Sequence, residues 1–449
     1  MIGVPNVKVA YFPIGRTTFE METAQRVFRE AKQLLESLYC RLIVPEGVLS
    51  STAELEEFIE HHRDFNPDLV VYQPITFADA EFIVKIVERY DAPVLVWSVR
   101  EPSVGARLRL NSLTGCNSAC NMLKYFERDF NFMLGNATEP QVARTLRAEL
   151  AAADVAAKLK DLSVGVVGEH PAGFYFSGVD ERLLMKTTGV KLVRLDLQQL
   201  FEEAMKVPEE EYAPLIEAAA SKVVGLNRDE ETTLKFAKFS ANLKKRLAER
   251  GVKAVAMRCW PDFFVEFGAA PCSTLSQFIE DGLVASCEAD INGVITMYIV
   301  KELSGGSPPY LGDLVHVDEE RNTVSFWHCG AGAYSLANPS TGARAGTHPN
   351  RKMGFTLEFG LKPGDVTIAR LSQTSKGYRM LIMRGEALDR PQQFAGTSGE
   401  VRLGGNAREI VHALMLEGFE PHYAIVYADI AEELKALSKR LGIETVIYP

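Results

Sequence analysis

The chain has 449 residues, which corresponds to about three domains of ordinary size. Its hydrophobic content of 47% and charged content of 24% are those of a folded protein, so predominant disorder is excluded. The formal net charge of −10 argues against a nucleic-acid binder that relies on neutralising phosphates, and the apolar runs are far shorter than the roughly 20 residues of a membrane-spanning helix.

The first third of the chain alternates short apolar runs with stretches of helical periodicity. Strands are expected at 7–12, 41–45, 69–74, 94–99 and 132–135, and helices at 19–38, 52–61, 78–90 and 139–159. This rhythm is typical of βαβ units in a parallel sheet. We therefore predict an N-terminal α/β domain over residues 1–160.

A second βα series begins near residue 162. Strands are expected at 162–168, 191–195, 254–257 and 284–287, and helices at 208–223, 228–250 and 291–303. This predicts a second α/β domain over residues 161–304. The turn 165–168 lacks the full Gly-x-Gly-x-x-Gly pattern, so a nucleotide cofactor is not indicated.

The composition changes after a Gly/Ser/Pro linker at 305–309. Short strand-like runs follow at 314–317, 323–327, 354–359, 365–371 and 378–384, and they indicate an antiparallel β unit such as a barrel. The last 45 residues return to α/β, with helices at 406–416 and 430–441 and strands at 423–427 and 445–448. We assign 305–449 to a third domain with a closing α/β segment.

The cysteines predict the redox compartment. They are seven, an odd number, without a Cys-x-x-Cys pair: Cys40, Cys116, Cys120, Cys259, Cys272, Cys287 and Cys329. A structural zinc site or a secreted disulfide scaffold would use closer or even-numbered cysteines. Because no signal peptide is visible at the start of the sequence either, we expect reduced thiols in a cytoplasmic protein.

Two acids stand where the strand at 284–287 ends and the next helix begins. Glu288 and Asp290 are two residues apart, and such residues share a face on an extended segment. Ligands of open parallel sheets bind at the carboxyl ends of strands. The simpler interpretation of Asp290 is a helix N-cap. Glu288 lacks such a role, and an acid beside an apolar strand needs a partner.

Further acid and imidazole side chains follow. Asp313 comes just after the linker, with His316 and His328 near it, and His422 precedes the strand expected at 423–427. Two carboxylates with one or two imidazoles suit a divalent ion such as Mn²⁺. Lone acids and histidines are also common on surfaces, so their spacing alone leaves the metal site open.

A basic cluster lies in a segment rich in Gly, Pro and Asn. It comprises Arg344, His348, Arg351 and Lys352. The cluster is either a site for an anion or a solvated basic loop.

Most of the chain, and most strongly the part from Arg258 onward, resembles the L-fucose/L-arabinose isomerase family. The segment 257–261 looks like the family's approach to its first metal carboxylate. The run Glu288-Ala-Asp-Ile-Asn-Gly is similar to the family segment whose leading Glu binds the metal. Asp313 in Tyr-Leu-Gly-Asp matches the second carboxylate, and His422 in Pro-His-Tyr-Ala matches the late histidine ligand.

Two further matches concern the substrate. His328 lies where the arabinose branch has an additional histidine, so it is expected at the substrate or as a fourth metal ligand. Ile14-Gly-Arg16 resembles the place where the family offers an arginine to the substrate of a neighbouring subunit.

The resemblance implies a fold and a reaction. The implied fold class is α/β, with two Rossmann-like parallel-sheet domains followed by a C-terminal antiparallel β-barrel domain, in a homotrimer or homohexamer. The implied reaction is metal-dependent aldose–ketose isomerisation through an ene-diol, with Mn²⁺ or another divalent cation. Glu288 and Asp313 would be both metal ligands and the acid/base pair, and His422 would complete the metal site.

The sequence leaves alternatives open for the substrate and for the class of function. Neutral deoxy sugars or pentoses are the family's default substrates. Arg344, His348 and Arg351 keep open an anionic sugar, such as a phosphorylated or 6-sulfonated hexose. Two α/β domains around a cleft also describe a non-catalytic sugar-binding protein.

Overall fold

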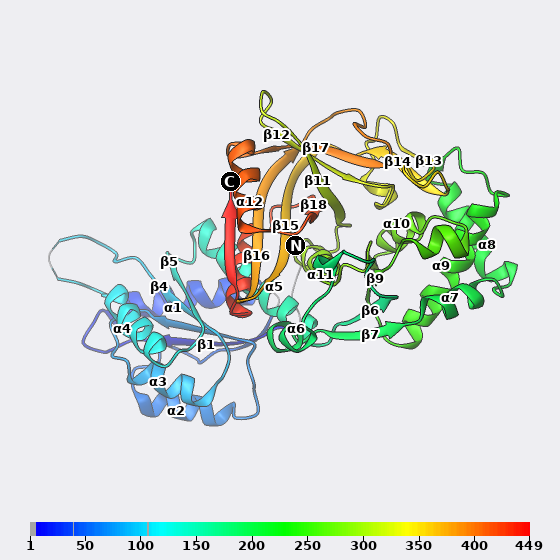
Figure 1. Ribbon diagram of the computed structural model, residues 1–449. Helices are drawn as coiled ribbons and strands as arrows, with labels where there is room; N and C mark the ends of the chain where they lie inside the picture. Colours follow the sequence, from blue (N-terminus) through cyan, green and yellow to red (C-terminus); the bar gives the residue numbers. More distant parts are fainter. Residues whose placement is uncertain (1–5, 39, 106) are drawn as a thin grey trace. The chain divides into compact units, whose positions relative to one another are not determined.

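The computed structural model describes residues 6–38, 40–105 and 107–449 (Figure 1). The chain divides into two compact units, Met1–Ala156 and Ala157–Pro449. The three-domain division expected from the sequence, with boundaries at residues 160 and 304, stays a prediction. Among the described residues, no helix is both long and apolar enough to cross a membrane.

The first unit is built on a parallel sheet of five strands in the order β2-β1-β3-β4-β5. The strands are β1 (Lys8–Ile14), β2 (Arg41–Ile43), β3 (Leu69–Pro74), β4 (Val94–Ser98) and β5 (Phe130–Leu134). The helices are α1 (Met21–Glu36), α2 (Thr52–His61), α3 (Glu81–Arg89), α4 (Ser112–Tyr125) and α5 (Pro140–Lys160). The predicted βαβ rhythm is confirmed, and α4 is an additional helix.

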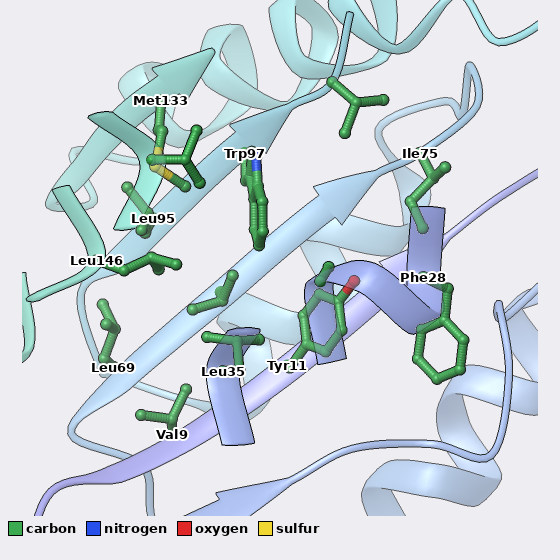
Figure 2. Close-up of a cluster of buried hydrophobic side chains, with 14 of the residues drawn as sticks. Val9, Tyr11, Phe28, Leu35, Leu69, Ile75, Leu95, Trp97, Met133 and Leu146 are labelled. Atoms are coloured by element: carbon green, nitrogen blue, oxygen red, sulfur yellow. The ribbon is translucent and has the colours of Figure 1, made fainter. Parts of the chain in front are cut away.

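Both faces of this sheet are covered, because side chains alternate along each strand. Val9, Tyr11 and Trp97 point to one face, where they pack with residues of α1 and α5 (Figure 2). Phe12 and Tyr72 point to the other face and pack with residues of α2, α3 and α4. Burial of both faces explains why the central strands β1, β3 and β4 read as continuous apolar runs.

The second unit begins with a parallel sheet in the order β10-β9-β6-β7. Its strands are β6 (Ser163–Val167), β7 (Lys191–Leu195), β9 (Ala254–Met257) and β10 (Val284–Ser286). The helices of this part are α6 (Glu181–Thr188), α7 (Leu197–Ala204), α8 (Glu209–Ala220), α9 (Glu231–Glu249), α10 (Cys272–Glu280) and α11 (Ile291–Leu303). Three short turns of helix accompany them: η1 (Tyr175–Ser177), η2 (Phe263–Phe267) and, further on, η3 (Tyr334–Leu336).

A closed six-stranded antiparallel barrel follows, with its strands bonded in the cyclic order β16-β15-β18-β11-β12-β17. They are β11 (Tyr310–Asp318), β12 (Thr323–His328), β15 (Gly364–Thr374), β16 (Gly377–Ala387), β17 (Thr397–Leu403) and β18 (His422–Val426). The remaining elements are β8 (Val223–Val224), β13 (Ala343–Gly346), β14 (Thr356–Gly360), β19 (Glu444–Tyr448), α12 (Ala407–Glu417) and α13 (Ala431–Arg440). The expected fold class is thus confirmed.

Helix α11 links the parallel sheet to the barrel. It contacts β9 and β10 on one side and β15 and β18 on the other. This position explains its composition, since ten consecutive residues, 291–300, are buried and no polar stripe remains. Its N-terminus therefore lies where the end of β10 meets the barrel strands.

Candidate functional site

Glu288 lies in a strained turn between β10 and α11. Glu288 and Ala289 have φ values of 49° and 52°, in the left-handed region that costs an L-residue roughly 1–2 kcal/mol. The Ala289 amide donates to the carbonyl of Met257 on β9, and the Asp290 amide donates to the carbonyl of Cys287, both at 3.0 Å. Strained residues held in this way cluster at functional sites.

The barrel brings two further ligand-type side chains to this turn. Asp313 on β11 and His422 on β18 are direct partners across an antiparallel strand pair. His422 Nε2 lies 3.4 Å from Glu288 Oε2 and 3.4 Å from Asp313 Oδ1. Two carboxylates and one imidazole nitrogen therefore converge, although they are 25 to 134 positions apart in the sequence.

Asp290 is completely buried and has two roles. As the N-cap of α11 it accepts the amide of Gly293 at 2.8 Å. It also forms a bidentate ion pair with the fully buried Arg370, at 2.6 and 3.1 Å. Burial raises the pKa of Asp290, but Arg370 and a hydrogen bond from His422 outweigh burial and hold the pKa well below its ordinary value.

The two histidines present different nitrogens to the site. His422 donates from Nδ1 to Asp290 Oδ2 at 2.9 Å, which leaves the lone pair of Nε2 facing the two carboxylates. In His328, Nδ1 accepts the backbone N–H of Cys329 at 2.9 Å, so the neutral ring carries its hydrogen on Nε2. The two rings are 6.0 Å apart. His422 thus presents a lone pair to the site and His328 an N–H, and the two histidines form with Glu288 a group of side chains that could hold a metal ion.

The carboxylate of Glu288 is only partly satisfied. The Cys259 thiol, whose pKa burial raises to about 11, donates to Oε1 at 3.6 Å. The other oxygen, Oε2, is buried and forms no hydrogen bond with the described residues. Burial raises the pKa of Glu288 above its ordinary value, although both histidines counteract it. A buried, unsatisfied carboxylate oxygen is what a cation or a substrate hydroxyl would complete.

Aromatic rings from the loop after β6 connect this centre with the basic segment. The ring of Phe176 lies 5.3 Å from that of His422, Phe174 lies 5.3 Å from both Phe176 and Trp260, and the Arg351 guanidinium lies 5.4 Å from the Trp260 ring. These three rings form an aromatic wall, with His422 at one end and the guanidinium of Arg351 at the other.

The remaining predicted residues have varied positions. His348 is buried and packs against Phe264, to which Arg351 is also close, at ring distances of 5.0 and 5.9 Å. Arg344 is exposed and lies in strand β13, not in the loop that the sequence predicts, because β13 pairs with both β14 and β8. Arg16 belongs to the first unit, where it pairs with Asp79 and lies 5.2 Å from the Phe82 ring.

Sequence reasoning missed several residues of this site. Arg370 is an arginine inside an apolar strand, and such a residue requires a buried acid, which is a usable signal. Cys259 and Phe176 carry no signal in the sequence. Their importance depends on where the loops after β9 and β6 meet the barrel.

Comparisons with known proteins identify the family. A family model described as "L-fucose isomerase, C-terminal domain" matches residues 343–448. "Sulfoquinovose isomerase" of Priestia aryabhattai is 52% identical over 443 residues, with 99% of each chain covered. The proteins of the same name from Alkalicoccus urumqiensis and Clostridium sp. (strain MSTE9) are 47% and 38% identical, each covering 98% of this chain and 98% and 99% of their own.

Solved structures add little. A periplasmic sugar-binding protein of an ABC transporter from Legionella pneumophila aligns at 9% identity over 64% of this chain and 100% of its own, with a TM-score of 0.17. A likeness of this size carries no argument.

Proposed function

The chain belongs to the fucose isomerase-like family that contains the sulfoquinovose isomerases, and from this premise we propose that it converts a 6-sulfonated aldohexose into its ketose with a divalent cation. Because the chain belongs to this family, it is an aldose–ketose isomerase and not a non-catalytic sugar-binding protein. Sulfoquinovose is a hexose with a sulfonate on C6, which favours the anionic substrate over the neutral default.

One observation carries the assignment of the centre. Glu288 Oε2 and Asp313 Oδ1 each lie 3.4 Å from His422 Nε2, and Glu288 Oε2 lacks a hydrogen bond among the described residues. This O,O,N donor set fits a cation such as Mn²⁺, and we propose these three residues as its ligands. When bound, the cation would polarise the sugar oxygens at C1 and C2 and stabilise the charge that develops between them.

The protein's own groups supply the proton transfers. Isomerisation moves a proton between C2 and C1, which requires a group that can both accept and release it. We assign this task to Glu288, with Asp313 as its partner on the other side of the centre. His328, with hydrogen on Nε2, donates to a sugar oxygen.

The basic residues bind the end of the sugar that carries the sulfonate. We assign the sulfonate to Arg351 and His348, with Arg344 on the strand that leads into the same segment. Guanidinium groups bind oxyanions through paired N–H donors. Arg16 serves a neighbouring subunit within a homotrimer or homohexamer.

The direct test compares Glu288→Gln and Asp313→Asn with Glu266→Gln. The first two keep side-chain size and remove the charge, and we expect each to lower Mn²⁺-dependent turnover of a 6-sulfonated aldohexose by at least about a thousandfold. Glu266 is exposed on η2, where it accepts a hydrogen bond from Gln198, so its variant should turn over normally. Exchange of the C2 hydrogen with D₂O should fail in the same two variants. Full activity of both would contradict the assignment.

A further inference from the structure

Four buried thiols from four separate segments gather behind Glu288. Cys259 follows β9, Cys272 begins α10, Cys287 follows β10 and Cys329 follows β12. All four are free and at most 7% exposed. Cys259 has a role as a donor to Glu288, whereas the isomerase chemistry leaves the other three unused.

Cys272 and Cys329 are placed as a pair. Their Sγ atoms are 3.7 Å apart, which is van der Waals contact, and a disulfide requires about 2.0 Å. Hydrogen bonds connect helix α10, which carries Cys272, with the segment that follows Cys329. The amide of Gly332 donates to Ser276 Oγ on α10 at 3.0 Å, and the Tyr334 hydroxyl donates to Gln277 Oε1 at 3.1 Å.

Cys329 is the more reactive member of the pair. Its Sγ lies 3.3 Å from His328 Nδ1, so the sulfur is in direct contact with the imidazole ring. Hydrogen bonds from Cys272 and Cys287, together with His328, hold the pKa of the Cys329 thiol well below its ordinary value. A low-pKa thiol beside an imidazole, with a second thiol in reach, has the chemistry of an oxidisable cysteine, and Cys329, at 7%, is the most exposed of the four.

We propose that Cys329 and Cys272 are a peroxide-sensitive thiol pair that closes to a disulfide beside the active centre. The Cys329 thiolate attacks one oxygen of hydrogen peroxide, so that an S–O bond forms, the O–O bond breaks and hydroxide leaves. The Cys272 sulfur then displaces the sulfenic oxygen, which departs as water with the Cys272 proton. The two sulfurs together lose two electrons and the peroxide gains them.

Formation of the disulfide removes the thiol that His328 contacts, so the oxidised enzyme has a lower turnover than the reduced enzyme. This consequence rests on the proposed function, because it assumes that His328 binds the sugar. Formation of the disulfide itself rests only on the positions of Cys272 and Cys329.

The test exposes the reduced, Mn²⁺-loaded enzyme to hydrogen peroxide, blocks the remaining thiols with iodoacetamide and maps the peptides. We expect a Cys272–Cys329 crosslink, a severalfold loss of turnover and recovery with dithiothreitol. Cys272→Ser should be active before oxidation, form no crosslink and leave Cys329 as a sulfenic acid that dimedone traps. Cys116→Ser is the matched control, since Cys116 is equally buried, lies in the first unit and has a pKa that burial raises to about 12.

Two results would overturn the thiol pair: no Cys272–Cys329 crosslink in the native sequence, or a crosslink of Cys329 to Cys287 in its place. A mapped crosslink that leaves turnover unchanged supports the pair and contradicts the role of His328 at the sugar. The two failures are therefore distinguishable.

Discussion

Asp290 accepts the Nδ1–H of His422 at 2.9 Å, and this hydrogen bond joins the start of helix α11 to barrel strand β18. The same carboxylate is held by Arg370, which no solvent reaches. The hydrogen bond fixes the tautomer of His422 and increases the basicity of Nε2, as carboxylates behind metal-binding histidines do. Asp290 is therefore a positioning residue that acts through His422.

Replacing Asp290 separates its two roles, because Asn is as good an N-cap as Asp. In Asp290→Asn the helix cap is kept, but Arg370 loses its bidentate partner and keeps Glu420, whose Oε2 lies 3.5 Å from the Arg370 Nε. We expect the free energy of unfolding to fall by about 3–5 kcal/mol, measured by urea denaturation. Mn²⁺ affinity, measured by titration calorimetry, should fall about 10–100-fold.

The matched control is Asp180→Asn. Asp180 is the exposed N-cap of α6, where it accepts the amides of Arg182 and Leu183. The same substitution there should change stability by less than about 0.5 kcal/mol. Equal effects at both positions would mean that Asp290 is only a cap.

The depressed pKa of Asp290 predicts how its contribution depends on pH. A carboxyl whose pKa is lower in the folded state stabilises that state above its unfolded pKa of about 3.9, and the stabilisation disappears as pH falls through the folded pKa. The stability difference between the native sequence and Asp290→Asn should therefore be constant from pH 5 to 7 and shrink below about pH 4. Urea midpoints of the metal-free proteins measure it, and a difference that grew on acidification would contradict the ion pair.

The fold could be predicted where packing follows local pattern. Strands β3, β7 and β9 and helices α2 and α11 lie within the predicted ranges. Helix α4 was missed because its sequence, Ser-Leu-Thr-Gly-Cys-Asn-Ser, is poor in helix formers, and it depends on packing of Cys116, Ala119 and Leu123 against the sheet. Strand β17 was missed for a similar reason, since its Thr-Ser-Gly-Glu start is a strand only because it closes the barrel.

The candidate site divides in the same way. Glu288, Asp313 and His422 were brought together by resemblance to a family, since nothing local links residues so far apart. The interpretation of Asp290 as an N-cap is confirmed. Its partner Arg370 is 80 positions away and meets it only because α11 packs against β15. Long-range contacts of this kind leave no trace in the periodicity of a single sequence.

Cation binding should stabilise the enzyme, because Mn²⁺ would bind the folded carboxylate pair and not the unfolded chain. At a Mn²⁺ concentration a hundredfold above its dissociation constant, we expect about 2.7 kcal/mol of added stability. Thermal unfolding before and after chelation measures the effect. Glu288→Gln should lose most of the shift, whereas Glu266→Gln should keep it. An equal shift in Glu288→Gln would place the cation elsewhere.

Arg351 should decide how the enzyme distinguishes a sulfonated from a neutral hexose. The guanidinium lies at the end of the aromatic wall, close to the rings of Trp260 and Phe264, and guanidinium groups bind oxyanions through planar N–H donors. Charged hydrogen bonds contribute about 1.5–3 kcal/mol, so Arg351→Ala should lower kcat/KM for the sulfonated sugar about 10–100-fold and leave a neutral hexose unaffected.

Arg351→Lys should recover part of the loss, because it restores the charge without the planar donors. Arg344→Ala should have a smaller effect, since Arg344 lies on β13 opposite Glu358, and the exposed Arg408→Ala on α12 should have none. If Arg351→Ala lowered kcat/KM equally for both sugars, the residue would be needed for the fold of the segment and not for the sulfonate.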